Sequence, residues 1–85
     1  MRYVISYDLT REPYSSYQDL WDELGRFGAR RVLLSQWGLR HGNTSVKALR
    51  EHFDRFLDDD DRILVVCIDN SSYSARNLIN AIKDL

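Results

Sequence analysis

The sequence is poor in the residues that mark several protein classes. Its single cysteine, Cys67, excludes an internal disulfide framework and a cysteine-rich zinc site. One proline and four glycines, beside 44% hydrophobic residues, exclude a chain that is disordered by composition. No run approaches the roughly 18 apolar residues that a membrane-spanning helix needs, and the apolar stretch after Met1 is too short for a signal peptide. We therefore expect a soluble, cytoplasmic protein in which Cys67 is a reduced, buried thiol.

The chain has enough apolar residues to fold into one small domain. Eighty-five residues, 44% of them hydrophobic, suffice for one core and not for two, so we predict a single domain over residues 1–85. A domain of this size buries only about 60% of the surface that its unfolded chain exposes. A homodimer is therefore the expected state.

Neither sign of charge is in clear excess, because the net charge is only −1. Its distribution is uneven: residues 26–55 carry seven basic side chains and two acidic ones. This asymmetry has two interpretations, a basic face for nucleic acid or ordinary solvated helix faces.

Hydrophobic periodicity divides the chain into alternating strands and helices. The predicted strands are 2–8, 29–35, 36–41 and 63–68, the last an apolar run typical of a strand covered on both faces. The predicted helices run from a capping box at Ser15 and Gln18 to Gly25 and Gly28, from a cap at Asn43, Thr44 or Ser45 to Leu57, and over 75–85. Residues 58–61 are expected to form a solvated acidic turn.

This order of elements predicts an α+β, ferredoxin-like βαββαβ sandwich with an additional C-terminal helix. The expected strand order is 4-1-3-2. In that topology Asp8, residues 35–37 and residues 60–62 gather at one end of the sheet, whereas Asp69 lies at the other end.

Asp8 is the principal candidate for chemistry because it ends a central strand where the chain turns polar. A carboxylate there can bind Mg²⁺ or Mn²⁺, which prefer oxygen ligands. One carboxylate makes a weak site, but two copies of Asp8 facing each other across a dimer axis would supply a divalent site able to activate water. The alternative is that Asp8 only satisfies backbone groups of the following turn.

Several other residues are candidates for binding or for support of the site. Arg30, Arg31 and Arg40 stand at strand ends, where their guanidinium groups suit phosphate oxygens or simply face solvent. Ser35 is expected to form hydrogen bonds near Asp8. Trp37 is interpreted either as a base-stacking residue or as part of the core or of a dimer interface. The two histidines, His41 and His52, lack metal-ligand spacing.

Two segments resemble a known family. Tyr7-Asp8-Leu9 closes the first strand, and Arg30-Arg31-Val32-Leu33-Leu34-Ser35-Gln36-Trp37 follows a helix that ends at Gly28. Together they resemble the CRISPR-associated Cas-two family of spacer acquisition and its relatives, the virulence-associated protein D toxins.

The resemblance implies a ferredoxin-like homodimer with a divalent metal between paired strand-end aspartates. It also implies cleavage of RNA or DNA in some members and a DNA scaffold for an integrase in others. Carried over to this sequence, Asp8 would be the catalytic metal ligand, Ser35 and Trp37 would lie near it, and Arg31 would contact phosphate.

The leading hypothesis is therefore a Cas-two-like homodimer that binds nucleic acid and cleaves it with Mg²⁺ or Mn²⁺ at Asp8. The alternatives are a non-catalytic scaffold, a partner of an integrase or antitoxin, and a regulatory ferredoxin-like dimer. Loss of cleavage on mutation of Asp8 favours the enzyme. Salt-sensitive binding without cleavage favours the scaffold.

Overall fold

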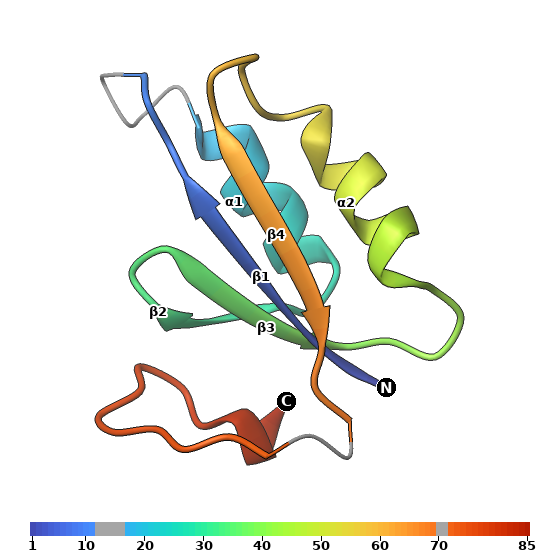
Figure 1. Ribbon diagram of the computed structural model, residues 1–85, viewed down its shortest axis with the longest axis vertical. Helices are drawn as coiled ribbons and strands as arrows, with labels where there is room; N and C mark the ends of the chain where they lie inside the picture. The colour runs from blue at the N-terminus through green and yellow to red at the C-terminus, as the bar shows by residue number, and fades with distance from the viewer. Residues whose placement is uncertain (12–16, 70–71) are drawn as a thin grey trace.

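The computed structural model describes residues 1–11, 17–69 and 72–85, and in these it shows an antiparallel sheet of four strands with two α-helices (Figure 1). The strands are β1 (Arg2–Asp8), β2 (Arg30–Leu33), β3 (Gln36–Arg40) and β4 (Arg62–Cys67). The helices are α1 (Gln18–Arg26), between β1 and β2, and α2 (Val46–Asp54), between β3 and β4. The sheet order β2-β3-β1-β4 confirms the predicted strand order and makes β1 an interior strand.

The core lies between the sheet and the two helices, which cover the same face (Figure 1). Strand β1 alternates, so Tyr3, Ile5 and Tyr7 all point to this face and are buried there. The helices contribute the rest of the core, chiefly Leu20, Leu24, Leu49 and Phe53. Cys67, paired with Tyr3 across the sheet, is a half-buried free thiol rather than a fully buried one.

The ends of the helices follow local sequence signals. Ser45 caps α2, since its hydroxyl accepts a hydrogen bond from the Ala48 N–H at 3.0 Å. Gly28 closes α1 at a φ of +78°, a conformation that glycine adopts without strain. Gly25, expected to end the helix, lies inside it, and α2 ends at Asp54 rather than at Leu57. The predicted capping box at Ser15 lies outside the described residues.

Strand β4 is not covered on both faces, contrary to the prediction. It lies at the edge of the sheet, and its exposure alternates along the strand. Ile63 and Val65 pack against the core, whereas Leu64 is 60% exposed and Val66 is 39% exposed on the helix-free face. The continuous apolar run therefore forms one strand with two apolar faces, and the helices cover only one of these faces.

The predicted third α-helix over 75–85 is wrong, because the segment forms only a short 3₁₀ helix, η2 (Ile82–Asp84). Its polar groups bond to the sheet instead: the Ile79 N–H donates to the Val32 carbonyl at 3.0 Å, and the Asn80 amide donates to the Arg31 carbonyl at 2.8 Å. An α-helix over residues 75–85 would be short, and a short helix is only marginally stable unless its whole apolar face packs against the protein. The apolar spacing instead places Ile82, 9% exposed, on the helix-free side with Val4.

The same segment packs closely on the sheet at one point. A Cβ atom at position 38 would collide with the side chain of Leu85, so Gly38 permits the chain end to approach β3. Across the described residues, no helix is long and apolar enough to cross a bilayer.

Candidate metal and phosphate site

Asp8 is the last residue of β1 and lies on the helix-free side, opposite Arg62 of β4. Its carboxylate is 70% exposed, and its Oδ2 atom lies 3.6 Å from Nη1 of Arg62, whose side chain is 82% exposed. Because both groups are in water, this ion pair contributes little to stability. The carboxylate therefore remains accessible to a ligand.

The turn between β2 and β3 lies beside Asp8, as the topology predicts. The Tyr7 N–H donates to the Ser35 carbonyl at 3.1 Å, which ties the turn to the end of β1. A hollow of about 280 Å³ lies there. Its lining residues include Asp8, Ser35, Gln36 and Arg62.

Asp69, also as predicted, is at the opposite end of the sheet from Asp8. Its Oδ1 atom accepts a hydrogen bond from the Arg2 N–H at 2.8 Å, and its Oδ2 atom is 3.7 Å from the amino terminus. The Arg2 N–H and the terminal charge together hold the pKa of Asp69 below its ordinary value, against the effect of burial. Asp69 therefore fastens a chain end and takes no part in the Asp8 site.

Trp37 points to the helix-covered face and not into the hollow beside Asp8. Its indole Nε1 donates to the Tyr7 hydroxyl at 2.9 Å, and Trp21 of α1 donates to the same oxygen at 3.1 Å. Of the two interpretations of Trp37, packing within the fold is thus the one that its contacts favour.

Arg31 is the one predicted arginine that lies near Asp8. Its guanidinium carbon is 4.8 Å from the ring centre of Trp37 and 5.3 Å from that of Trp21. Arg31 lines a second hollow, of about 450 Å³, together with Asp8 and Ser35. A cation over indole rings is held by their negative faces, so Arg31 has a defined place at this site.

Arg30 and Arg40 do not join Arg31. Neighbouring residues of a strand point to opposite faces, so Arg30 is exposed on the other side of β2, where it pairs with Gly38. Arg40 pairs with Arg2 at the end of the sheet that holds Asp69. The three arginines therefore do not form one phosphate-binding patch.

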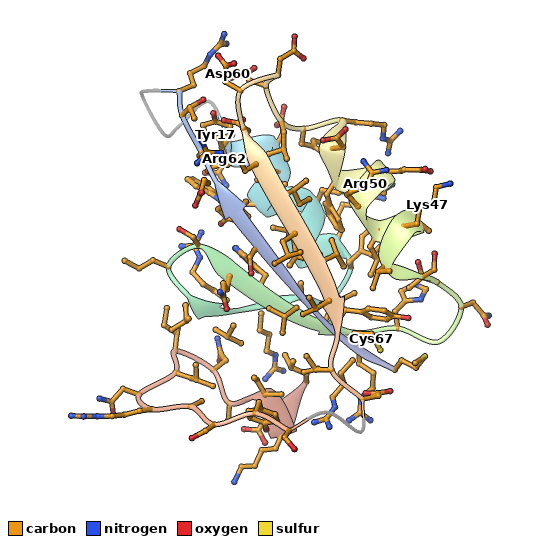
Figure 2. All side chains as sticks on the ribbon, in the orientation of Figure 1. Tyr17, Lys47, Arg50, Asp60, Arg62 and Cys67 are labelled. Carbon is orange, nitrogen blue, oxygen red and sulfur yellow. The ribbon has the colours of Figure 1, made fainter. Side chains whose placement is uncertain are left out.

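Three basic residues of the stretch 26–55 have acidic partners on α1 and α2. Lys47 is 3.8 Å from Glu51, and Arg50 lies near both Glu51 and Asp54 on the exposed side of α2, where Figure 2 labels the two basic residues. Arg26 bonds to Glu23 at 2.8 Å. These contacts favour the interpretation of solvated helix faces over that of a single basic face.

The acidic turn 58–61 is not only a solvated turn, because the Asp61 side chain holds it in place with hydrogen bonds. The Asp61 carboxylate accepts hydrogen bonds from the N–H and hydroxyl of Thr10, the Tyr17 hydroxyl and the Asp58 N–H, all at 2.8–2.9 Å. Burial alone would raise the pKa of Asp61, but these four donors outweigh it and lower the pKa. Burial and the adjacent Asp61 raise the pKa of Tyr17. Asp61 thus joins the segment after β1 to the turn before β4.

Sequence reasoning missed a pair between the two helices, formed by the buried Glu23 of α1 and the half-buried His52 of α2. Glu23 is 8% exposed, and its Oε2 atom lies 2.6 Å from Nε2 of His52. The Arg55 guanidinium lies 2.9 Å from Nδ1 of His52, and because arginine can only donate, Nδ1 accepts and Nε2–H donates to Glu23. The signal was present in the sequence, since Glu23 falls among Leu20, Leu24 and Phe27 on the apolar side of its helix.

Within the described residues, no three histidine, cysteine, aspartate or glutamate side chains are grouped closely enough to hold a metal ion. Asp8 therefore offers one carboxylate, with oxygen chemistry that suits Mg²⁺ or Mn²⁺ but without a second acidic ligand from the same described chain. No family model matches the sequence.

Proposed function

We propose that this chain is a Cas-two-like, ferredoxin-like protein that acts on nucleic acid as a homodimer, with Asp8 binding the Mg²⁺ or Mn²⁺ needed for phosphodiester cleavage. The observation that carries the proposal is the place of Asp8. A 70% exposed carboxylate ends an interior strand and lines two adjoining hollows, one of which also contains Arg31. The antiparallel sheet of order β2-β3-β1-β4, with α1 after β1 and α2 after β3, supports the ferredoxin-like part of the proposal.

The solitary carboxylate supports a dimer rather than a monomer as the active form. A divalent ion held by a single aspartate would keep nearly all of its waters and bind weakly. A second copy facing the helix-free side would bring another Asp8 to the same ion. The exposed Leu64 and Val66 lie on that side and offer apolar area to a second copy.

Each residue has a separate task under this proposal. Asp8 binds the metal, which when bound supplies a Lewis acid and lowers the pKa of a water. Arg31 binds a phosphate oxygen of the substrate. Ser35 shapes the turn beside both groups, and Trp37 fixes Arg31 from the helix-covered face.

The decisive experiment measures cleavage of labelled single-stranded RNA and double-stranded DNA with Mg²⁺, Mn²⁺ or EDTA. We expect cleavage by the wild type with metal, and a loss of at least 100-fold in Asp8→Asn, because the substitution removes the ligand charge while keeping the shape. The matched control is Asp60→Asn, which makes the same change in the turn at the same end of the molecule (Figure 2). Metal-dependent cleavage that survives in Asp8→Asn would overturn the role of Asp8.

A non-catalytic scaffold or an integrase or antitoxin partner is the second candidate. It is favoured by the ion pair between Asp8 and Arg62, which already satisfies the carboxylate in part. This alternative predicts binding that weakens with salt, needs no metal and is unaffected by EDTA. Binding without cleavage in the same titration would select it over the nuclease.

A further inference from the structure

Arg31 is a partly buried cation for which the described residues provide no counter-ion. No carboxylate of the described chain lies within ion-pair distance of its guanidinium, and its Nε atom is buried without a hydrogen-bond partner. The two indole rings replace only part of the lost hydration, since a cation–π contact does not satisfy N–H donors. Burying an unpaired charge is costly, so the site is one that an anion would stabilise.

Two hydroxyl-bearing residues, Tyr7 and Ser35, line the same hollow as Arg31. The Tyr7 oxygen accepts from both indoles, and no described residue accepts its own hydrogen. Ser35 lines the hollow from the β2–β3 turn. Arg31, Tyr7 and Ser35 come from three different elements, so their donors approach from several directions. This arrangement suits a tetrahedral phosphoryl group better than a planar carboxylate.

The hollow is larger than a phosphate ion and has an apolar wall. Its volume is about 450 Å³, and Trp21, Leu9 and Leu34 form part of the lining. Leu34 is 80% exposed. An organic group attached to the phosphate would therefore find apolar and aromatic contact. Asp8 also lines the hollow, but its charge is partly balanced by Arg62.

We propose that this hollow binds the phosphoryl group of a phosphate monoester, with Arg31 as the main contact and Tyr7 and Ser35 as hydroxyl donors. The inference rests on the phosphate contact proposed above for Arg31, but binding needs no metal and no cleavage, so it can fail or succeed separately from the role of Asp8. The monoester is either a free mononucleotide or the terminal phosphate of a nucleic acid strand.

Tryptophan fluorescence provides a direct test, because both tryptophans of the sequence contact Arg31. The wild type is titrated in EDTA with adenosine monophosphate, with adenosine as the control for base quenching, and with chloride at matched ionic strength. We expect a saturable change with the monophosphate alone. Oligonucleotides with a 5′-phosphate or a 5′-hydroxyl then distinguish a strand end from a free ester as the source.

Variants identify the group that binds. Arg31→Gln is expected to weaken monophosphate binding at least tenfold, and Arg31→Lys less, since lysine keeps the charge without the fork of donors. Arg76→Gln, the same change at an exposed arginine outside this hollow, should bind as the wild type.

A measurement on the wild type keeps the test valid if Arg31→Gln fails to fold. In a ¹⁵N–¹H spectrum the two indole N–H signals and the Arg31 Nε–H signal should shift together as monophosphate is added. Equal responses to adenosine and its monophosphate, or undiminished binding by folded Arg31→Gln, would overturn the proposal.

Discussion

Asp61 shows how a single side chain can organise a turn that its sequence describes only as acidic. Residues 58–61 are all aspartates with the same side chain. Among them, only Asp61 accepts four hydrogen bonds in the described part of the chain, and the donors come from three separate segments. The donors at Thr10 and Tyr17 lie 51 and 44 residues away in the chain. No local pattern distinguishes Asp61 from its neighbours, so this role could not be predicted without the sheet that brings the segments together.

We predict that Asp61→Asn destabilises the protein by about 1–3 kcal/mol, because the new amide would direct N–H groups at donors that now bond to a carboxylate. Asp60→Asn, at a side chain with no hydrogen bond or ion pair among residues 1–11, 17–69 and 72–85, should change stability by less than about 0.5 kcal/mol. Urea unfolding near pH 7 measures both. Equal stability of the two variants at pH 7 would contradict the role of Asp61.

The pH dependence of this difference has a definite sign. The folded-state pKa of Asp61 is below its ordinary value of 3.8, so its contribution is complete well above pH 3.8 and is lost as the pH falls through the lower, folded-state pKa. The stability gap between wild type and Asp61→Asn should therefore shrink in acid. A gap that widens below pH 3.8 would show that the carboxylate is not stabilised in its charged form.

At the scale of elements, the helices are joined to each other as well as to the sheet. The Glu23–His52 pair links α1 to α2, and the rings of Phe27 and Phe53 pack around His52, with ring centres 4.8 and 5.0 Å away. Helical periodicity predicts the apolar face of each helix well. It does not predict a buried polar pair between two helices, because that depends on the distance at which they pack.

We predict that Glu23→Ala destabilises the protein by about 2–4 kcal/mol, since it leaves the half-buried Nε2–H of His52 without an acceptor and removes the bond to Arg26. The control is Glu51→Ala on α2, where the ion pairs with Lys47 and Arg50 are exposed and should contribute less than about 1 kcal/mol. Urea unfolding at pH 7 compares them. Similar losses in both would show that the buried pair adds nothing beyond a surface ion pair.

For the whole molecule, the prediction succeeded where the alternation of apolar residues along a strand identifies the face that packs on the core. The strand over residues 2–8 followed from its alternation, and the sheet order followed from the order of the elements, which together place Asp8 beside the β2–β3 turn. The place of Arg31 beside Asp8 and its two tryptophan neighbours were not predicted, because they depend on how the side chains pack at the sheet edge. The prediction failed at residues 75–85, where apolar spacing fits either a helix or a strap, and contacts with β2 select the strap.

We predict that two copies of the protein dimerise through the helix-free face of the sheet. The C-terminal segment packs over part of this face and leaves Val66, on the same side as Asp8, 39% exposed. If two copies meet there to share a metal between their Asp8 residues, Val66→Glu should place like charges at the interface. The dissociation constant of the dimer should then rise at least tenfold. Val46→Glu makes the same change at a 41% exposed valine on α2, away from that face, and should leave the dimer intact. Sedimentation equilibrium measures both. A dimer that resists Val66→Glu, or a wild type that stays monomeric with Mg²⁺, would refute the shared site, because one Asp8 then has no second carboxylate to complete it.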